Sequence, residues 1–113
     1  MHELSLTQSI IELAIHHANR ENAVAIRSIT VEIGALSGVV ADAVEFAFDV
    51  CCKGTMADGA QLDIRRITGV GLCLECHRES QLEALTHVCP HCGRLSMVTV
   101  QGQEMKFIEM EIN

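Results

Sequence analysis

The chain has 113 residues, of which 49% are hydrophobic and 20% are charged. This length suits one domain with a small appended module and excludes a large multidomain enzyme, while the apolar content excludes a disordered chain. The formal net charge of −7 argues against a partner held mainly through phosphates, so we do not expect a nucleic-acid partner.

An amphipathic helix and a strand are predicted at the start of the chain. Apolar residues at helical spacing predict a helix from Leu6 to Asn19, with Ser5 and Gln8 as its capping box. Alternating apolar and polar residues from Ile29 to Ile33 predict a half-buried strand that ends at Gly34. The expected buried face of the helix comprises Leu6, Ile10, Leu13, Ala14 and His17.

A second helix is predicted to begin at Ser37 and Gly38 and to end near Lys53. Apolar residues are nearly continuous from Ala43 to Cys52, which predicts that this helix packs on a sheet along most of its width. The expected buried stripe comprises Val40, Val44, Ala47, Phe48 and Cys51.

Three more strands are predicted in the second half of the chain, interrupted by a Cys-rich segment. The composition shifts at Gly69-Val70-Gly71, and residues 73–95 hold four Cys and three His with little hydrophobic periodicity. Ile108, Met110 and Ile112 are expected on one face of the last strand. The three strands are expected at Gln61–Ile67, Met97–Val100 and Met105–Ile112.

These elements predict an α+β fold, in which a small three-stranded sheet carries two helices and a zinc-ribbon-like minidomain is inserted before the final strand. We expect an α/β domain from residues 1–68 and 97–113, and a metal-binding minidomain from residues 69–96.

The N-terminal sequence and the hydropathy predict a cytoplasmic protein without a membrane segment. The first residues lack the basic and apolar regions of a signal peptide, and no apolar run approaches the roughly 20 residues that span a bilayer. In a reducing compartment, clustered cysteines are more often metal ligands or redox groups than disulfides.

Four of the six cysteines form two C-x-x-C pairs, Cys73 with Cys76 and Cys89 with Cys92, and twelve residues separate the pairs. This spacing is typical of two knuckles that close one tetrahedral site. Four soft thiolates favour Zn²⁺, and a filled tetrahedral shell leaves no position for a substrate. We therefore predict a structural zinc site.

Two alternatives stand beside zinc: a redox-active C-x-x-C pair, and iron in a rubredoxin-like site. The second matched pair argues against redox chemistry, and the short gap and lack of aromatic residues argue against iron. The histidines near the pairs are expected to be exposed neighbours of the site. Cys51 and Cys52 have no assigned role.

The N-terminus offers a second set of metal ligands. The amine of Met1, the backbone amide and imidazole of His2, and a fourth nitrogen such as the amide of Glu3 would form a square plane. This geometry suits Ni(II) or Cu(II) and does not suit tetrahedral Zn²⁺. Affinity alone favours Cu(II), so the ligand set by itself does not name the metal.

Four sequence features, in the same order and covering essentially the whole chain, resemble the HypA/HybF family of hydrogenase maturation proteins. They are Met1-His2-Glu3-Leu4-Ser5-Leu6, Ile33-Gly34-Ala35-Leu36-Ser37, Phe46-Ala47-Phe48 followed by Gly54-Thr55, and the four-cysteine array. The resemblance implies a nickel metallochaperone with nickel at Met1, His2 and Glu3, and structural zinc at Cys73, Cys76, Cys89 and Cys92.

The resemblance further implies transfer of nickel to the large subunit of [NiFe] hydrogenase with the GTPase HypB, and in some members service to urease. We expect a monomer or homodimer without enzymatic activity, since no nucleophile motif, paired carboxylates or phosphate loop is present. The alternative is a zinc-ribbon adaptor for proteins or nucleic acid. Against nucleic acid, residues 73–93 contain one Arg, three Glu and no aromatic residue.

Overall fold

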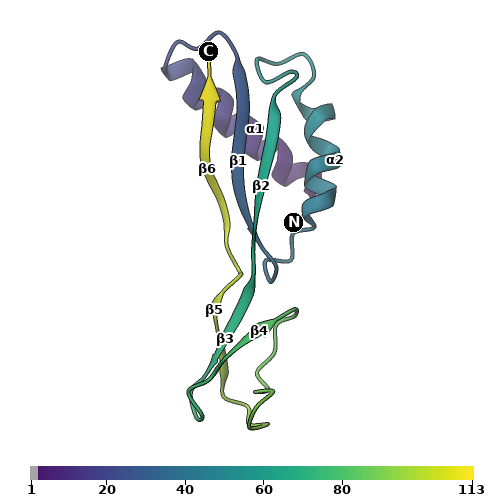
Figure 1. The fold of residues 1–113 in the computed structure, drawn as a ribbon. Coiled ribbons are helices and arrows are strands. Elements are labelled where there is room, and N and C mark those ends of the chain that lie inside the picture. The colour runs from purple at the N-terminus through teal and green to yellow at the C-terminus, as the bar shows by residue number, and fades with distance from the viewer. Residues whose placement is uncertain (1–2) are drawn as a thin grey trace. The chain divides into compact units, whose positions relative to one another are not determined.

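The computed structural model describes residues 3–113, which form two helices and six strands (Figure 1). Their order along the chain is α1 (Glu3–Arg20), β1 (Ile26–Gly34), α2 (Ala41–Cys52), β2 (Gln61–Ile67), β3 (Gly69–Cys73), β4 (Glu79–Leu82), β5 (Met97–Gln101) and β6 (Met105–Ile112). No helix in this described range is long and apolar enough to cross a membrane.

The described chain divides into two compact units. The first unit, the helical unit, contains residues 3–31, 40–65 and 106–113; the second, the cysteine unit, contains residues 32–39 and 66–105. In the helical unit, α1 lies behind the strands and contacts α2 (Figure 1). Its buried side chains are mostly Ile, Val and Ala, as the scarcity of aromatic residues requires.

Helix α1 begins at Glu3, earlier than predicted, so Ser5 lies inside the helix and the predicted capping box is wrong. The buried face is also displaced from the prediction: Leu13 and His17 are exposed, whereas Thr7 is fully buried. Thr7 tolerates burial because its hydroxyl donates a hydrogen bond to the carbonyl of Glu3, 2.6 Å away. The residues that α1 buries are Thr7, Ile10, Ile11, Ala14 and Ala18.

Helix α1 ends at Arg20, one residue after the predicted end at Asn19. The N–H of Ala23 donates to the carbonyl of Ala18 at 3.0 Å, and the N–H of Asn22 donates to that of Asn19 at 3.1 Å. Asn22 has a φ of 56°, the left-handed conformation that completes a Schellman motif. An Asn at this position therefore turns the chain from the helix toward β1.

Helix α2 begins at Ala41, four residues later than predicted, and ends at Cys52. Gly38, with a φ of 79°, and the Ser37 hydroxyl, which accepts the N–H of Val39, form a turn ahead of the helix instead. The predicted broad contact with the sheet is wrong, because Phe46 and Val50 are exposed. The residues that α2 buries are Ala41, Val44, Phe48 and Cys52.

One three-stranded sheet has the order β2-β1-β6, which confirms the predicted sheet with its two helices. Its central strand β1 is mostly buried, while both neighbours alternate between half-buried and exposed residues. In β6 the half-buried positions are Met105, Phe107, Met110 and Ile112, so Phe107 is more buried than Ile108.

A second three-stranded sheet, with the order β4-β3-β5, builds the cysteine unit and was not predicted. Both β4 and β5 pair antiparallel with β3. Sequence periodicity missed β3 because two of its five residues are glycines. Gly71 must be small, since a Cβ there would lie 2.5 Å from Met97 Sδ and 2.7 Å from Leu82 Cδ1. The glycine-rich segment is thus a paired central strand.

The segment after β1 joins the cysteine unit through backbone hydrogen bonds. The N–H of Ala35 donates to the carbonyl of Ile67 at 2.8 Å, and the N–H of Leu36 donates to that of Gly102 at 2.7 Å. Leu36 then packs in a small core that it shares with Cys73, Leu82, Cys89 and Met97. Two of these five core side chains are cysteines, and the other three are Leu36, Leu82 and Met97.

Replacing Gly34 by Ala is expected to destabilise the protein by about 3 kcal/mol, the upper part of the range for overpacked sites. A Cβ at Gly34 would collide with the carbonyl of Gly102, and backbone atoms cannot move aside as flexible side chains do. Urea unfolding of both proteins measures the difference. A G34A midpoint equal to that of the parent chain would contradict this close approach.

Candidate metal centre

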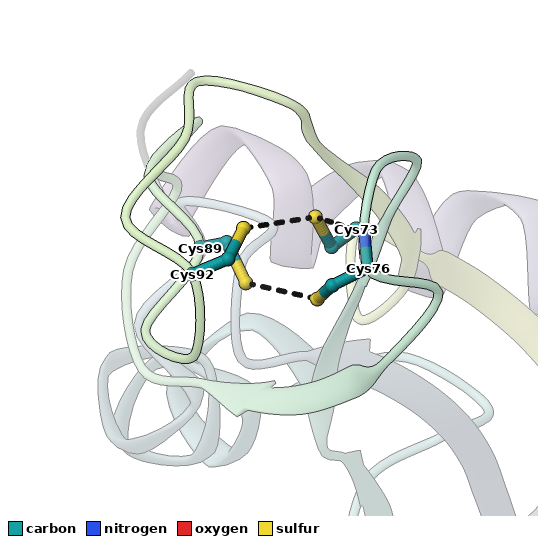
Figure 2. Close-up of side chains that lie close together, drawn as sticks. All are labelled: Cys73, Cys76, Cys89 and Cys92. Atoms are coloured by element: carbon teal, nitrogen blue, oxygen red, sulfur yellow. Dashed lines mark hydrogen bonds between the residues drawn. The ribbon is translucent and has the colours of Figure 1, made fainter.

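The four predicted zinc ligands converge in the cysteine unit (Figure 2). Cys73 ends β3 and Cys76 follows in the next turn, whereas Cys89 and Cys92 lie in the segment between β4 and β5. Their four Sγ atoms lie within 4.8 Å of one another. Cys73 and Cys89 are buried, and Cys92 is the most exposed of the four.

The distances between the sulfurs fit a tetrahedral metal. Cys73 Sγ lies 3.7 Å from Cys92 Sγ, and Cys76 Sγ lies 3.7 Å from Cys89 Sγ. Four sulfurs at the usual Zn–S distance of about 2.3 Å would be about 3.8 Å apart. None of the four cysteines is in a disulfide. The distances between their sulfurs therefore fit a site that would hold a Zn²⁺ ion and not a pair of disulfides.

The two knuckles have the same backbone hydrogen bonds. The N–H of His77 donates to the carbonyl of Cys73 at 2.9 Å, and the N–H of Gly93 donates to that of Cys89 at 2.8 Å. Both turn residues have positive φ, 62° at His77 and 74° at Gly93. This conformation is ordinary for glycine, and histidine adopts it more readily than most other residues do.

Backbone amides also point at the first sulfur of each pair. The N–H of Cys76 donates to Cys73 Sγ, and the N–H of His91 donates to Cys89 Sγ, both at 3.4 Å. The amide of Cys76, with the Ser96 hydroxyl 3.2 Å from the same sulfur, lowers the pKa of the Cys73 thiol from 9.0 to about 5. Hydrogen bonds likewise lower the pKa of Cys89.

The second sulfur of each pair behaves oppositely. A backbone hydrogen bond from Arg78 lowers the pKa of the Cys76 thiol. Burial and hydrogen bonds with the neighbouring sulfurs together outweigh it, and they raise this pKa to about 11. The pKa of Cys92 is raised for the same reasons. The first sulfur of each pair therefore loses its proton more readily than the second.

Zinc binding near neutral pH is expected to release fewer than four protons, because Cys73 is already a thiolate there. As the pH falls through about 5, Cys73 becomes protonated, so proton release rises and zinc affinity falls. A lowered pKa also means that this thiolate stabilises the fold above pH 9 and loses that contribution as the pH falls to about 5.

Calorimetry of zinc binding in buffers of different ionisation enthalpy counts these protons. The Cys73→Ser variant is the control, because it removes the thiol whose pKa is lowered to about 5. Release of all four protons at neutral pH by the parent chain would contradict the ionisation pattern.

The remaining residues near the centre play lesser parts. Among residues 3–113 the metal-ligand group consists of the four cysteines, and the neighbouring histidines are exposed, as expected. Sequence reasoning missed Ser96, whose hydroxyl contacts Cys73, because nothing in the spacing distinguishes it. Cys51 and Cys52 lie on α2, which belongs to the helical unit. Burial raises the pKa of the Cys52 thiol to about 11.

The structure places one of the three predicted nickel ligands. Met1 and His2 lie outside the described residues, and Glu3 is the first described residue of α1. The Glu3 side chain is half-buried, and its Oε2 accepts a hydrogen bond from the N–H of Val40 at 3.5 Å. The start of α1 is thereby tied to the residue that precedes α2.

Comparison with known proteins gives one consistent result. Residues 1–112 match the family described as "Hydrogenase/urease nickel incorporation, metallochaperone, hypA". The chain is 42% identical over 112 residues to the hydrogenase maturation factor HypA of Rippkaea orientalis, covering 99% of this chain and 96% of that protein. It is 41% identical over 113 residues to HypA of a Geobacter species, covering 99% of each chain.

The fold comparison agrees. The solution structure of the nickel metallochaperone HypA from Helicobacter pylori superposes with a TM-score of 0.66 at 28% identity, covering 99% of this chain and 97% of that one. A second HypA solution structure reaches 0.70 at 29% identity, covering 100% and 97%. The predicted family and fold class are therefore confirmed, and the four clustered cysteines are suited to a structural zinc ion. The chain belongs to the HypA family of nickel-incorporation metallochaperones that mature hydrogenase.

Proposed function

We propose that this chain binds Ni(II) through the Met1 amine, the amide and imidazole of His2, and the backbone amide of Glu3. The observation that carries the proposal is the position of Glu3 at the start of α1. The first amides of a helix have no carbonyl partner within it, so the Glu3 amide is available to a ligand. The other support is the chemistry of a histidine at position two.

A nickel site of this kind suits a carrier. Binding displaces protons from an amine, amides and an imidazole, so affinity falls as the pH drops through the range in which histidine titrates. A ligand set within the first three residues of the chain also leaves room for an acceptor to replace the carrier's ligands one at a time with its own. We propose that the protein transports the ion and catalyses no reaction.

The wider cellular role follows from family membership and belongs to the same proposal. The helical unit holds the nickel, while the cysteine unit, which includes the predicted minidomain of residues 69–96, is stabilised by zinc. The acceptor is the large subunit of [NiFe] hydrogenase, with HypB as the assisting GTPase, and urease is a second destination named in the family description. The protein works in the cytoplasm as a monomer or homodimer.

Nickel titration of two forms of the protein tests the ligand set. One form has Met1 as its free N-terminus, and the other carries one additional residue before Met1. The extension converts the amine into an amide and shifts the chelate, so tight binding should be lost. Equal affinity in the two forms would overturn the N-terminal site while leaving the zinc centre untouched.

A further inference from the structure

A serine hydroxyl lies against the buried sulfur of the first knuckle. Ser96 Oγ is 3.2 Å from Cys73 Sγ, and the exposed fraction of Cys73 is 0%. A metal-bound cysteine is a thiolate, which accepts hydrogen bonds and has no proton to donate. In the zinc-loaded protein, Ser96 is therefore the donor and Cys73 the acceptor.

The pairing of two strands holds Ser96 in this place. Ser96 directly precedes β5, and its neighbour Met97 lies opposite Cys73 in the antiparallel pair of β3 and β5. The carbonyl of Ser96 accepts the N–H of Leu74 at 3.0 Å, and the N–H of Met97 donates to the carbonyl of His87 at 3.0 Å. The backbone around the hydroxyl is thus already ordered, so its hydrogen bond to the sulfur costs little further entropy.

Burial makes this donor more important to Cys73 than it would be to an exposed ligand. Four thiolates around one Zn²⁺ leave two negative charges in excess, and a buried charge without hydrogen-bond donors is unfavourable. Cys92 Sγ, 3.7 Å from Cys73 Sγ, belongs to an exposed residue that water can solvate. Cys73 is closed to water, so its donors must come from the protein. They are the amide of Cys76, 3.4 Å from the sulfur, and the hydroxyl of Ser96.

We propose that Ser96 is a positioning residue of the zinc centre, whose hydroxyl holds and stabilises the metal-bound thiolate of Cys73 and thereby raises the affinity for zinc. Hydrogen bonds to charged groups are roughly twice as strong as those between neutral groups. Loss of a group that hydrogen-bonds a metal ligand typically costs about 10- to 100-fold in metal affinity. This role concerns the zinc centre and is independent of the proposed nickel ligands.

Competition with a chromophoric chelator measures the zinc affinity of the full chain. Ser96→Ala should weaken this affinity by about 10- to 100-fold. Ser96→Thr keeps a hydroxyl and should retain most of the affinity. Ser80→Ala is the matched control, because Ser80 is a half-buried serine on β4 of the same unit whose hydroxyl has no hydrogen-bond partner among the described residues. Its zinc affinity should equal that of the parent chain.

Cobalt substitution separates this role from a general loss of stability. In the Co(II)-loaded protein, the sulfur-to-cobalt charge-transfer band reports the electron density on the thiolates. A thiolate that loses a hydrogen bond donates charge to the metal more readily, so the band of Ser96→Ala should move to lower energy. The bands of Ser80→Ala and Ser96→Thr should stay close to that of the parent chain.

Each outcome decides the proposal. Unchanged zinc affinity in Ser96→Ala overturns it, as does an equal loss of affinity in Ser80→Ala or in Ser96→Thr. A parent chain that binds no zinc overturns it as well. Weaker zinc binding by Ser96→Ala without a shift of the cobalt band would show that the side chain only packs against the centre, and would also reject the proposed hydrogen bond.

Discussion

Replacing His2 by Ala is expected to weaken nickel binding by more than about 100-fold. Loss of the imidazole opens the six-membered chelate ring, and this should cost more than the 10- to 100-fold typical of changes around the ligands. The measurement is a nickel titration followed through the absorption bands of a square-planar complex. His16→Ala is the control, because His16 is an exposed histidine on α1 at a distance in sequence from the proposed ligands.

Substitutions at Glu3 separate its backbone from its side chain. Glu3→Pro removes the amide proton while leaving α1 intact, since proline is well accepted at the start of a helix. It should therefore lose a nickel ligand without unfolding. Glu3→Ala keeps the amide and should retain nickel binding. If Glu3→Ala abolishes binding and Glu3→Pro does not, the ligand is the carboxylate and the proposed nitrogen set is wrong.

Replacing Cys89 by Ser is expected to unfold most of the cysteine unit. Zinc binding contributes roughly 10 to 16 kcal/mol in isolated zinc fingers, which is comparable to the whole stability of a typical domain. The core cluster around the two buried ligands contains three other buried side chains, Leu36, Leu82 and Met97. Without the metal, so few apolar side chains cannot offset the entropy of ordering the chain.

Hydrogen exchange of the backbone amides measures this effect by segment. In Cys89→Ser, protection should fall across residues 66–105, while α1 and α2 should retain theirs. Cys51→Ser is the matched control, since Cys51 is a half-buried free thiol on α2 outside the metal centre. Preserved protection across residues 66–105 after loss of zinc would show that the metal is not needed for folding.

Regular patterns in the sequence correctly predicted features that depend on residues close together in the chain. The two C-x-x-C pairs predicted a four-sulfur cluster because each knuckle is a short turn with a fixed reach. Alternation in residues 61–67 and 105–112 predicted strands that the structure contains. The predicted buried faces of α1 and α2 were less accurate, because a buried Thr7 and an exposed Val40 both violate a simple apolar-inside rule.

The sequence by itself determined the family, the four clustered cysteines, both helices and four of the six strands, since these depend on spacing along the chain. Tertiary structure alone decided the rest. Glycines at 34, 69 and 102 allow distant backbone segments to approach closely, which brings Leu36 into the core of the cysteine unit. The packing of α1 against α2 decides that Phe46 is exposed. One face of α2 packs into the core of the helical unit, and the opposite face has no partner in the described part of that unit.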